Sequence, residues 1–517
     1  QTQLVLSLPR SQAALSSQRR IQSVTIFGNS LLPEVSTMSQ TETPTRSFGF
    51  FLNGNWSAHG REVVVTSPYD RSVLAVVSEA EREDVEVAIE SAVQAFAVTR
   101  KMTSHQRAGI LRKVAEGITT RREEFARTIC QEAGKPIKTS RIEVERAINT
   151  FQIAAEESTR IYGEYIPLDT LESTSGRWGL VRRFPLGPVF AITPFNFPLN
   201  LVAHKVAPAM AAGCPLILKP APQTPISSFL LAEIVQESGW PEGALAVMPL
   251  SNDNAALLVG DDRIKLLTFT GSAAVGWQLK SRAGKKRVTL ELGGNAGVIV
   301  HSDADLEHAA QRCIAGGFSY AGQTCISVQR ILVHQSVYQK FTELLVHGVR
   351  KLKLGDPMQE STDVPPLIRE QDAVRATEWV DEAVKGGAKL LCGGKRDGAM
   401  VEPTVLTGTS PAMRVNCAEI FAPVVTVEPY EFFPEALRQI NDSAYGLQAG
   451  VFTRDAGLIQ MAFEELEVGG VIAGDVPSFR VDQMPYGGVK DSGQGREGLR
   501  YSIEDMTERR LLVMAVR

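Results

Sequence analysis

Gly322-Gln323-Thr324-Cys325-Ile326-Ser327 lies between two patterns that predict different secondary structures. Before it, residues 304–319 have the apolar spacing of a helix, and after it the apolar run 330–333 predicts a strand. We expect a cysteine at such a junction, next to a flexible glycine, to lie at the end of a sheet, where α/β proteins bind ligands. The alternative is a buried cysteine that only fills space, which is the common role of cysteines inside cells.

A carboxylate and paired glycines precede this stretch in the chain. Glu291-Leu292-Gly293-Gly294 ends a run that predicts a strand, so Glu291 is also expected at the end of a sheet. A thiol and a carboxylate that meet at one sheet edge can act as nucleophile and general base. Cys325 and Glu291 are therefore the candidate catalytic pair.

Strand and helix patterns alternate on both sides of Glu291. From residue 189 to 292, short apolar runs alternate with helical spacing, which is typical of the parallel sheet of a nucleotide-binding domain. A second α/β set extends from residue 297 to about 470. Residues 163–187 break the rhythm with two strand-like segments, which predict an arm that projects from the domain.

The composition excludes several classes of protein. The chain has 517 residues, which predicts two or three domains, and its net charge of −4 gives no electrostatic footprint for nucleic acid or an anionic membrane. The most apolar stretch, residues 187–203, contains three prolines, so we expect no membrane span and a soluble protein. The six cysteines include no CxxC pair and the seven histidines no HxxxH spacing, which predicts neither a disulfide framework nor a metal site.

Residues 1–37 differ from the rest of the chain. They carry three arginines against a single acid, Glu34, and are rich in Ser, Gln and Leu, which suits an organellar transit peptide. The alternative is an N-terminal extension, expected to be disordered and outside the fold, with Met38 as a natural start. The extension would leave the protein cytoplasmic, as we expect, whereas a transit peptide would make it organellar.

Three loops carry groups that suit a nucleotide. Residues 269–276 end a strand and open a helix, where backbone N–H groups and the Ser272 hydroxyl suit a pyrophosphate; the alternative is a simple helix cap. Lys219 ends a strand before a proline-rich loop, which suits a ribose or phosphate contact. Glu419 and Phe421 offer a carboxylate for a sugar hydroxyl and an aromatic ring to flank a flat base.

A fourth loop, Pro194-Phe195-Asn196-Phe197-Pro198, follows another apolar strand. Its two prolines restrict the backbone, so the Asn196 amide is expected to be held rigidly enough to donate to an oxyanion. The alternative is a structural turn.

The order and spacing of these motifs closely resemble the NAD(P)-dependent aldehyde dehydrogenase superfamily over residues 50–517. Several segments are most similar to its family 21 succinate-semialdehyde dehydrogenases, with lactaldehyde and non-phosphorylating glyceraldehyde-3-phosphate dehydrogenases as close cousins. The motifs that carry the resemblance are PFNFP at 194–198, KPAPQTP at 219–225, FTGSAAVG at 269–276, ELGG at 291–294, GQTC at 322–325, EIFAP at 419–423 and PYGGVKDSG at 485–493.

The resemblance implies an α/β fold with three parts. A Rossmann-type cofactor domain takes residues 38–168 and 186–293, and an α/β catalytic domain takes residues 294–496. Residues 169–185 and 497–517 form a β oligomerisation arm, whose exposed edge needs a neighbouring sheet edge to cover it. We therefore expect a homo-oligomer, and a tetramer in preference to a dimer.

The resemblance also implies a mechanism. The Cys325 thiolate attacks the aldehyde, the Asn196 amide holds the oxyanion, hydride passes to the nicotinamide, and Glu291 activates the water that hydrolyses the thioester. The residues expected to contact the cofactor are Thr193, Pro194, Phe195, Lys219, Pro222, Gly271, Ser272, Gly276, Leu292, Glu419 and Phe421.

Three positions depart from the family pattern. Pro222 stands where the superfamily often has a glutamate that binds the adenosine ribose. A proline side chain cannot accept these hydrogen bonds, and it lacks the negative charge that would repel a 2′-phosphate. Because Lys219 is also nearby, we expect NADP to be preferred and NAD to be possible. Tyr486 replaces a common phenylalanine and Ala422 a common glycine, and neither is expected to touch the chemistry.

Two arginines indicate the substrate. Arg480 is on the loop that usually lines the aldehyde entrance, and Arg146 is where relatives that act on anionic aldehydes carry a second arginine. Two guanidinium groups suit a carboxylate or a phosphate; the alternative is a pair of surface arginines in ion pairs.

We therefore expect NADP-dependent oxidation of succinate semialdehyde to succinate. Two alternatives keep the fold and change the substrate to glyceraldehyde 3-phosphate or lactaldehyde. Another passes the thioester to coenzyme A, which the presence of Glu291 argues against because that reaction needs no hydrolytic base. The last is a catalytically silent structural or binding protein with the same fold.

Overall fold

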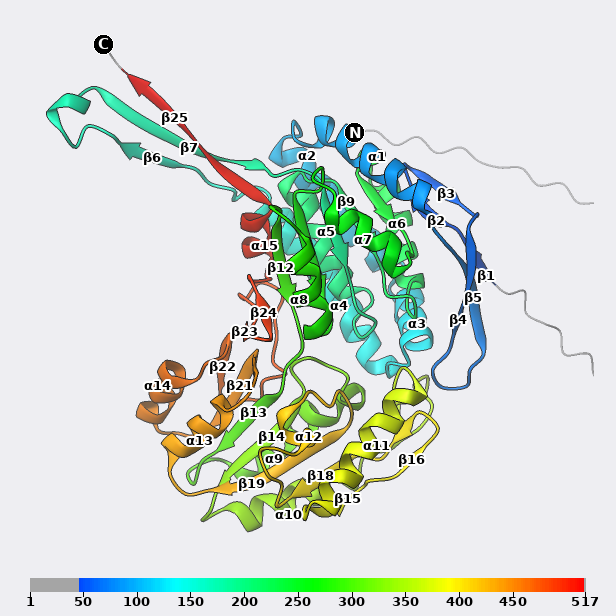
Figure 1. Cartoon of the computed structure of the whole chain (residues 1–517), viewed down its shortest axis with the longest axis vertical. Helices are drawn as coiled ribbons and strands as arrows, with labels where there is room; N and C mark the ends of the chain where they lie inside the picture. The colour runs from blue at the N-terminus through cyan, green and yellow to red at the C-terminus, as the bar shows by residue number, and fades with distance from the viewer. Residues whose placement is uncertain (1–45, 516–517) are drawn as a thin grey trace, which may run out of the picture. The chain divides into compact units, whose positions relative to one another are not determined.

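Two sheets, each covered by helices on both faces, carry the loops predicted to form the site (Figure 1). The computed structural model describes residues 46–515, so the extension expected at residues 1–37 lies outside the described residues. No helix in the described part of the chain is both long enough and apolar enough to cross a bilayer.

The first sheet contains the βαβ rhythm expected upstream of residue 293. Its five central strands are parallel, and the strand that flanks them on each side is antiparallel to them. The last strand, β3, is antiparallel to its neighbour β2. The strand order is β24 (Gly493–Gln494), β12 (Arg287–Glu291), β11 (Leu266–Thr270), β8 (Val189–Ile192), β9 (Leu216–Lys219), β10 (Leu245–Val247), β2 (Phe50–Leu52) and β3 (Asn55–Ser57).

Both faces of this sheet are apolar because neighbouring side chains on a strand point to opposite sides. On β8, Val189 and Ala191 belong to the core on one face, whereas Phe190 belongs to the core on the other. The first core is covered by α2 (Ser104–Thr120), α3 (Arg122–Ala133), α4 (Ile137–Glu157), α5 (Asn200–Ala212), α6 (Ile226–Glu237) and α15 (Leu499–Asp505). The second is covered by α1 (Arg82–Thr99), α7 (Asn252–Gly260) and α8 (Ala273–Arg282).

The second sheet is parallel apart from one edge strand, β15. Its strand order is β15 (Lys389–Cys392), β18 (Thr404–Thr407), β19 (Val424–Tyr430), β14 (Val328–His334), β13 (Ala296–Val300), β21 (Gln448–Phe452) and β22 (Gly470–Ala473). One face packs against α9 (Leu306–Phe318), α10 (Tyr338–Val349), α11 (Glu370–Lys385) and α12 (Arg414–Cys417). The other packs against α13 (Phe433–Asn441) and α14 (Ala456–Glu465).

Smaller pieces complete the described chain. A three-stranded sheet has the order β1 (Arg46–Phe48), β5 (Val73–Glu79) and β4 (Arg61–Thr66). Two ribbons pair β16 (Arg396–Asp397) with β17 (Met400–Val401), and β20 (Tyr445–Gly446) with β23 (Val489–Lys490). Two 3₁₀ turns are η1 (Glu172–Thr174) and η2 (Ser319–Gly322).

The expected arm is a three-stranded antiparallel sheet that projects from the first sheet and its helices (Figure 1). It consists of β6 (Glu164–Pro167), β7 (Arg177–Pro185) and β25 (Thr507–Ala515). Its second segment begins later than the expected residue 497, because Leu499 and Ile503 of α15 are buried in the core of the first sheet. β24 also joins that sheet, so the chain returns to it near residue 493, before the expected end of the second domain.

We expect the arm to be covered by a second copy of the chain. β25 is an edge strand, and Leu511, Leu512, Val513 and Met514 are each 41–54% exposed. Replacing Leu512 and Met514, which lie on one face of the strand, with lysine should lower the molar mass measured by light scattering, because charged side chains block strand pairing. Leu390→Lys, on the edge strand of the second sheet, is the control, and an unchanged mass for the double variant would contradict the expectation.

Candidate active site

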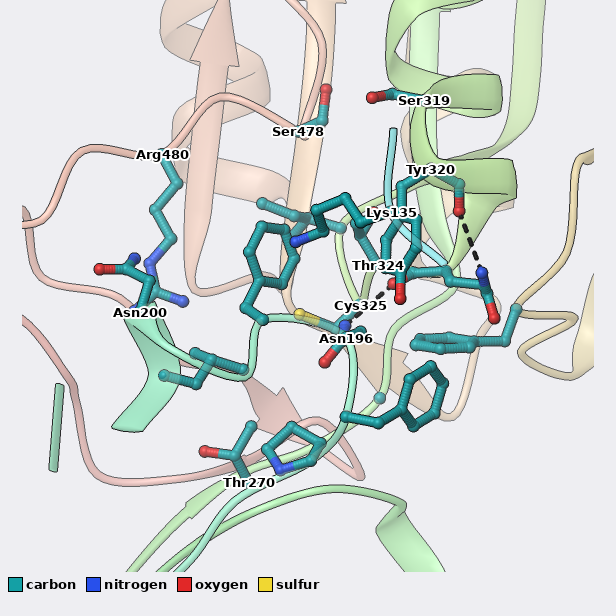
Figure 2. A pocket seen from close by; sticks show the side chains of 18 of the residues that line it. Lys135, Asn196, Asn200, Thr270, Ser319, Tyr320, Thr324, Cys325, Ser478 and Arg480 are labelled. Atoms are coloured by element: carbon teal, nitrogen blue, oxygen red, sulfur yellow. Dashed lines mark hydrogen bonds between the residues drawn. The ribbon is translucent and has the colours of Figure 1, made fainter. Parts of the chain in front are cut away.

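A cavity of about 670 Å³ lies beyond the carboxyl ends of β8, β11 and β12 and before the amino ends of β14 and β19 (Figure 2). It brings together most of the residues predicted from the sequence, although their segments are far apart in the chain. The predicted residues that line it are Arg146, Pro194, Phe195, Asn196, Gly271, Ser272, Glu291, Leu292, Cys325, Glu419, Phe421 and Arg480. Thr193, Lys219, Pro222 and Gly276 lie outside its wall.

The backbone before Cys325 has an unusual conformation. Tyr320, Ala321 and Gly322 all have left-handed φ angles, of 50°, 54° and 69°. Gly322 is required there, because a Cβ at this position would overlap the Ala422 carbonyl from the loop before β19. The Tyr320 hydroxyl donates to the Ala133 carbonyl at 2.7 Å, which fixes the turn against the end of α3. This turn presents the half-buried Cys325 thiol to the cavity.

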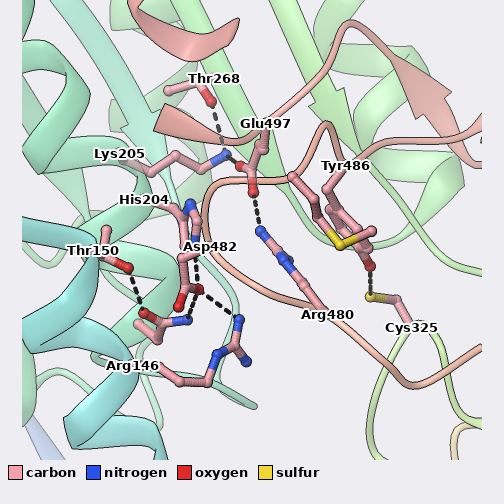
Figure 3. Close-up of polar contacts among 12 residues, drawn as sticks. Arg146, Thr150, His204, Lys205, Thr268, Cys325, Arg480, Asp482, Tyr486 and Glu497 are labelled. Carbon is pink, nitrogen blue, oxygen red and sulfur yellow. Dashed lines mark hydrogen bonds and ion pairs between the residues drawn. The ribbon is translucent and has the colours of Figure 1, made fainter. Parts of the chain in front are cut away.

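Tyr486 contacts the thiol directly. Its hydroxyl oxygen lies 3.0 Å from Cys325 Sγ, so the expectation that Tyr486 does not touch the chemistry is wrong (Figure 3). Burial raises the pKa of the Cys325 thiol to about 11, while the Tyr486 hydrogen bond and the Arg480 charge lower it. The departure from phenylalanine was visible in the sequence, but nothing there placed this hydroxyl beside the sulfur.

The Asn196 amide lies between the two sheets. Its Nδ2 donates to the Gln323 carbonyl at 2.9 Å, two residues before Cys325 (Figure 2). An amide nitrogen has two hydrogens, so one of them remains for an oxyanion next to Cys325. The expected rigidity therefore comes from a contact with the cysteine loop as well as from the flanking prolines.

A buried ion pair contacts the loop that carries Asn196. Lys135 pairs with Glu143 of α4, and Glu143 also accepts the Leu199 backbone N–H at 3.0 Å. Lys135 Nζ lies 3.5 Å from the centre of the Phe197 ring and 4.7 Å from that of Tyr320. Burial lowers the pKa of Lys135 to about 8, and the Glu143 charge opposes that shift. The sequence patterns did not identify this support.

Glu291 lies at the end of β12 with both carboxylate oxygens buried, and neither oxygen has a hydrogen-bond partner among residues 46–515. Burial, and then the charge of Glu497, raise the pKa of Glu291 well above its ordinary value. This environment favours the neutral form of the Glu291 carboxyl over the ionised form.

The two predicted arginines line the same cavity. Arg146 Nη2 donates to Asp482 at 2.7 Å, and Arg480 Nη2 donates to Glu497 at 2.9 Å (Figure 3). Both are in ion pairs, but neither is a surface residue: the side chain of Arg480 is only 8% exposed. The Nε–H of each arginine is buried, and no described residue accepts a hydrogen bond from it. Both guanidinium groups belong to the cavity wall, where their positive charge favours a bound anion.

Helix α5 supplies partners for the two acids. His204 Nε2 lies 2.9 Å from Asp482 Oδ1, and Lys205 Nζ donates to Glu497 (Figure 3). The charges of Lys205 and Arg480 lower the pKa of Glu497 although burial opposes this. One signal for these pairs was visible in the sequence: His204 and Lys205 are adjacent polar residues in a fully buried helix that is apolar apart from them and Asn200.

Groups expected to contact a nucleotide also line the cavity. The Glu419 carboxylate accepts the Gly294 backbone N–H at 3.0 Å, and burial raises its pKa to about 7. Phe421 has a left-handed φ of 51°, and its ring meets that of Phe195 edge-on, with 6.0 Å between the ring centres. Ser272 is at the N-cap of α8, but its side chain makes no capping hydrogen bond, so its hydroxyl is free for a ligand.

The predicted residues outside the cavity wall continue along the same sheet edge. The Thr193 N–H donates to the Lys219 carbonyl at 3.2 Å, which joins the carboxyl ends of β8 and β9. Burial lowers the pKa of Lys219 and the Glu79 carboxylate raises it. Pro222 is exposed in the following loop. Gly276 allows α8 to approach β12, since a Cβ there would overlap the Leu292 side chain.

Comparisons with known proteins agree with this geometry. A sequence model of the aldehyde dehydrogenase family matches residues 56–512. A 3-sulfolactaldehyde dehydrogenase from Priestia aryabhattai is 45% identical over 475 residues, which cover 91% of this chain and 99% of that protein.

Two solved structures are also similar. Aldehyde dehydrogenase 21 from Physcomitrella patens, in complex with the reaction product succinate, is 47% identical with a TM-score of 0.90, and the match covers 92% of this chain and 99% of that one. Glyceraldehyde-3-phosphate dehydrogenase GapN from Methanocaldococcus jannaschii, complexed with NADP, is 38% identical with a TM-score of 0.85, and the match covers 89% and 100%. The predicted family and α/β fold are thus confirmed. This chain belongs to the aldehyde dehydrogenase family, and it is an oxidoreductase that oxidises aldehydes with NAD or NADP.

Proposed function

We propose that this enzyme oxidises succinate semialdehyde to succinate, with NADP as its preferred cofactor. The observation that carries the proposal is that two guanidinium groups, those of Arg146 and Arg480, line the cavity that holds Cys325. A carboxylate at the far end of a short aldehyde can pair with these positive charges while its aldehyde group reaches the thiol.

The proposed chemistry begins at Cys325. Its thiolate attacks the aldehyde carbon, and the oxygen of the resulting thiohemiacetal accepts hydrogen bonds from the Asn196 amide and the Cys325 backbone N–H. One such donor is typically worth about 3 kcal/mol of transition-state stabilisation. Loss of hydride from the same carbon leaves a thioester. Glu291, once ionised, removes a proton from the water that cleaves this thioester.

The residues present fit a nicotinamide dinucleotide. The buried Glu419 carboxylate and the free Ser272 hydroxyl are polar groups that the described protein leaves available, and Phe195 and Phe421 supply flat apolar walls. When bound, the nicotinamide accepts the hydride. We place Glu419 at its ribose, Ser272 at the pyrophosphate, and Lys219 with Pro222 at the adenosine end. Thr193, Pro194, Gly271, Gly276 and Leu292 shape the backbone of the sheet edge.

Two residues near the proposed adenosine end, Pro222 and Lys219, favour NADP. Pro222 is exposed and carries no charge, so nothing at this position repels a 2′-phosphate. The Lys219 ammonium at the end of β9 attracts one. The GapN structure complexed with NADP supports this preference by analogy, since it is 38% identical to this chain.

The substrate proposal rests on charge and on shape. Succinate, 3-sulfolactaldehyde and glyceraldehyde 3-phosphate, which appear in the names of the three similar proteins, all carry a negative group. The planar fork of arginine matches a planar carboxylate better than a tetrahedral sulfonate or phosphate. Oxidation of 3-sulfolactaldehyde, lactaldehyde or glyceraldehyde 3-phosphate is the second candidate, favoured by the 45% identity to the sulfolactaldehyde enzyme.

The arm supports the proposal of a homo-oligomer, and we propose a tetramer. A dimer formed through one exposed strand edge leaves the rest of the arm uncovered, and a pair of dimers covers it.

The Cys325→Ala variant should lose hydride transfer by a factor of at least about a thousand, because no other group replaces the nucleophile. Binding of NADP, measured by fluorescence, should be unchanged. Glu291→Gln should instead release one burst of reduced cofactor per active site and then stop at the thioester. Cys417→Ala, which removes an exposed thiol, is the control. Steady turnover by Cys325→Ala would contradict the assignment of Cys325 as the nucleophile.

For the substrate, Arg146→Gln should lower kcat/KM for succinate semialdehyde by about tenfold to a hundredfold, the value of a charged hydrogen bond. Asp482 keeps His204 and Asn200 as partners in this variant, so the fold is expected to survive. Propanal, which has no anionic group, should be almost unaffected. Arg141→Gln on the same helix lies outside the cavity and is the control.

Wild-type initial rates with each candidate aldehyde complete this experiment. The highest kcat/KM with succinate semialdehyde supports the proposal. A higher value with 3-sulfolactaldehyde or glyceraldehyde 3-phosphate would keep the anion site and replace the substrate. An equal loss for propanal and succinate semialdehyde in Arg146→Gln would contradict the anion site itself.

For the cofactor, Pro222→Glu should lower the ratio of kcat/KM for NADP to that for NAD by at least about tenfold, because a carboxylate repels the 2′-phosphate and accepts hydrogen bonds from the ribose. Pro411→Glu, at another exposed loop position, should leave the ratio unchanged. Wild-type enzyme that already prefers NAD would show that Pro222 does not decide the preference.

A further inference from the structure

The cavity contains one polar contact that the chemistry proposed above does not use. The Tyr486 hydroxyl oxygen is 3.0 Å from Cys325 Sγ (Figure 3). We propose that Tyr486 is a further catalytic residue, whose hydroxyl donates a hydrogen bond to the Cys325 sulfur and stabilises the thiolate before attack and again when the thioester breaks. This inference rests on the proposed role of Cys325 as the nucleophile.

Tyr486 is held in place by its backbone and its ring. Its N–H donates to the Glu497 carbonyl at 3.1 Å, and the Glu497 N–H donates back to the Tyr486 carbonyl at 2.6 Å. The ring is buried in a small apolar cluster with Ile326 and Leu447, next to Cys325. The hydroxyl is therefore directed at the sulfur by a fixed ring rather than by a mobile side chain.

The direction of the hydrogen bond follows from which group keeps its proton. Burial raises the pKa of Tyr486 well above its ordinary value, so the phenol remains protonated. A thiolate has no hydrogen and can only accept. The Arg480 guanidinium lies 3.7 Å from the centre of the Tyr486 ring, and its positive charge draws electron density from the ring and makes the hydroxyl a better donor.

Few other groups near the sulfur favour its ionisation. Burial opposes the thiolate, and the carboxylates of Glu419 and Glu291 oppose it as well. The groups that favour it are the Tyr486 hydroxyl and the Arg480 charge. Arg480 is already paired with Glu497, so Tyr486 is the group that contacts the sulfur directly.

The proton on Tyr486 stays in place throughout the reaction. In the attack, which follows loss of the Cys325 proton to solvent water, a sulfur lone pair forms the C–S bond and the carbonyl π electrons move to the oxygen. In the hydrolysis, water forms a C–O bond and gives its proton to Glu291, and the C–S electron pair returns to sulfur. The departing thiolate then accepts the hydrogen bond from Tyr486, which lowers the barrier to its departure.

Alkylation of Cys325 by iodoacetamide tests the hydrogen bond without any aldehyde. Tyr486→Phe keeps the ring and its packing but removes the donor. The pH profile of Cys325 alkylation, followed by mass spectrometry of its peptide, should shift to higher pH. Below both pKa values the rate should fall about tenfold or more, since a charged hydrogen bond is worth roughly one pKa unit or more. Tyr338→Phe removes a hydroxyl bonded to Thr407 and should not shift the profile.

A second replacement works in the opposite direction. Substituting 3-fluorotyrosine at position 486 gives a more acidic phenol, which is a stronger donor, so the profile should shift to lower pH. If Tyr486→Phe folds and its profile superimposes on that of the wild-type enzyme, the proposal is overturned. If Tyr486→Phe does not fold, an unshifted profile of the 3-fluorotyrosine enzyme overturns it. Steady turnover by Cys325→Ala would instead refute the nucleophile, so the two failures are distinguishable.

Discussion

The site depends on one buried carboxylate, Glu497, which lies between two positive charges. Lys205 comes from α5 under the first sheet, and Arg480 comes from the loop that follows the second sheet. Removing a buried charge from such a group leaves its partner unpaired and typically costs about 3–5 kcal/mol. The two ion pairs therefore depend on one another, and they hold the loop at 478–497 against α5 of the first sheet.

A series of contacts connects Glu497 to the sulfur of Cys325. Arg480 covers the Tyr486 ring, the Glu497 backbone pairs with that of Tyr486, and the Tyr486 hydroxyl reaches Cys325. A second acid on the same loop, Asp482, bonds to α5 through His204 and to α4 through Arg146. The proposed anion site and the thiol are thus positioned by one loop, so a change that loosens the loop is expected to affect binding and chemistry together.

The sequence predicted the parts of the site that local motifs carry. Cys325, Glu291 and Asn196 each follow or precede a strand within a short, recognisable segment, and the alternation of strands and helices placed them at sheet ends. It did not predict the packing that depends on distant residues: Lys205 and Glu497 are 292 positions apart, and no spacing rule connects them. The same limit applies to α15, which looks like the start of the arm in sequence but is buried beside α5.

The charges also bear on the two half-reactions proposed for this site. Lys205, Arg480 and Glu497 together leave one positive charge to be balanced, and Arg480 lowers the pKa of both Cys325 and Glu291. The charge of Glu291 raises the pKa of Cys325, so the thiol ionises more easily while Glu291 is neutral. A neutral Glu291 permits the thiolate that attack requires. Once the sulfur is bound in a thioester it carries no charge, and the positive cluster then favours ionised Glu291, which makes the base available when water must be activated.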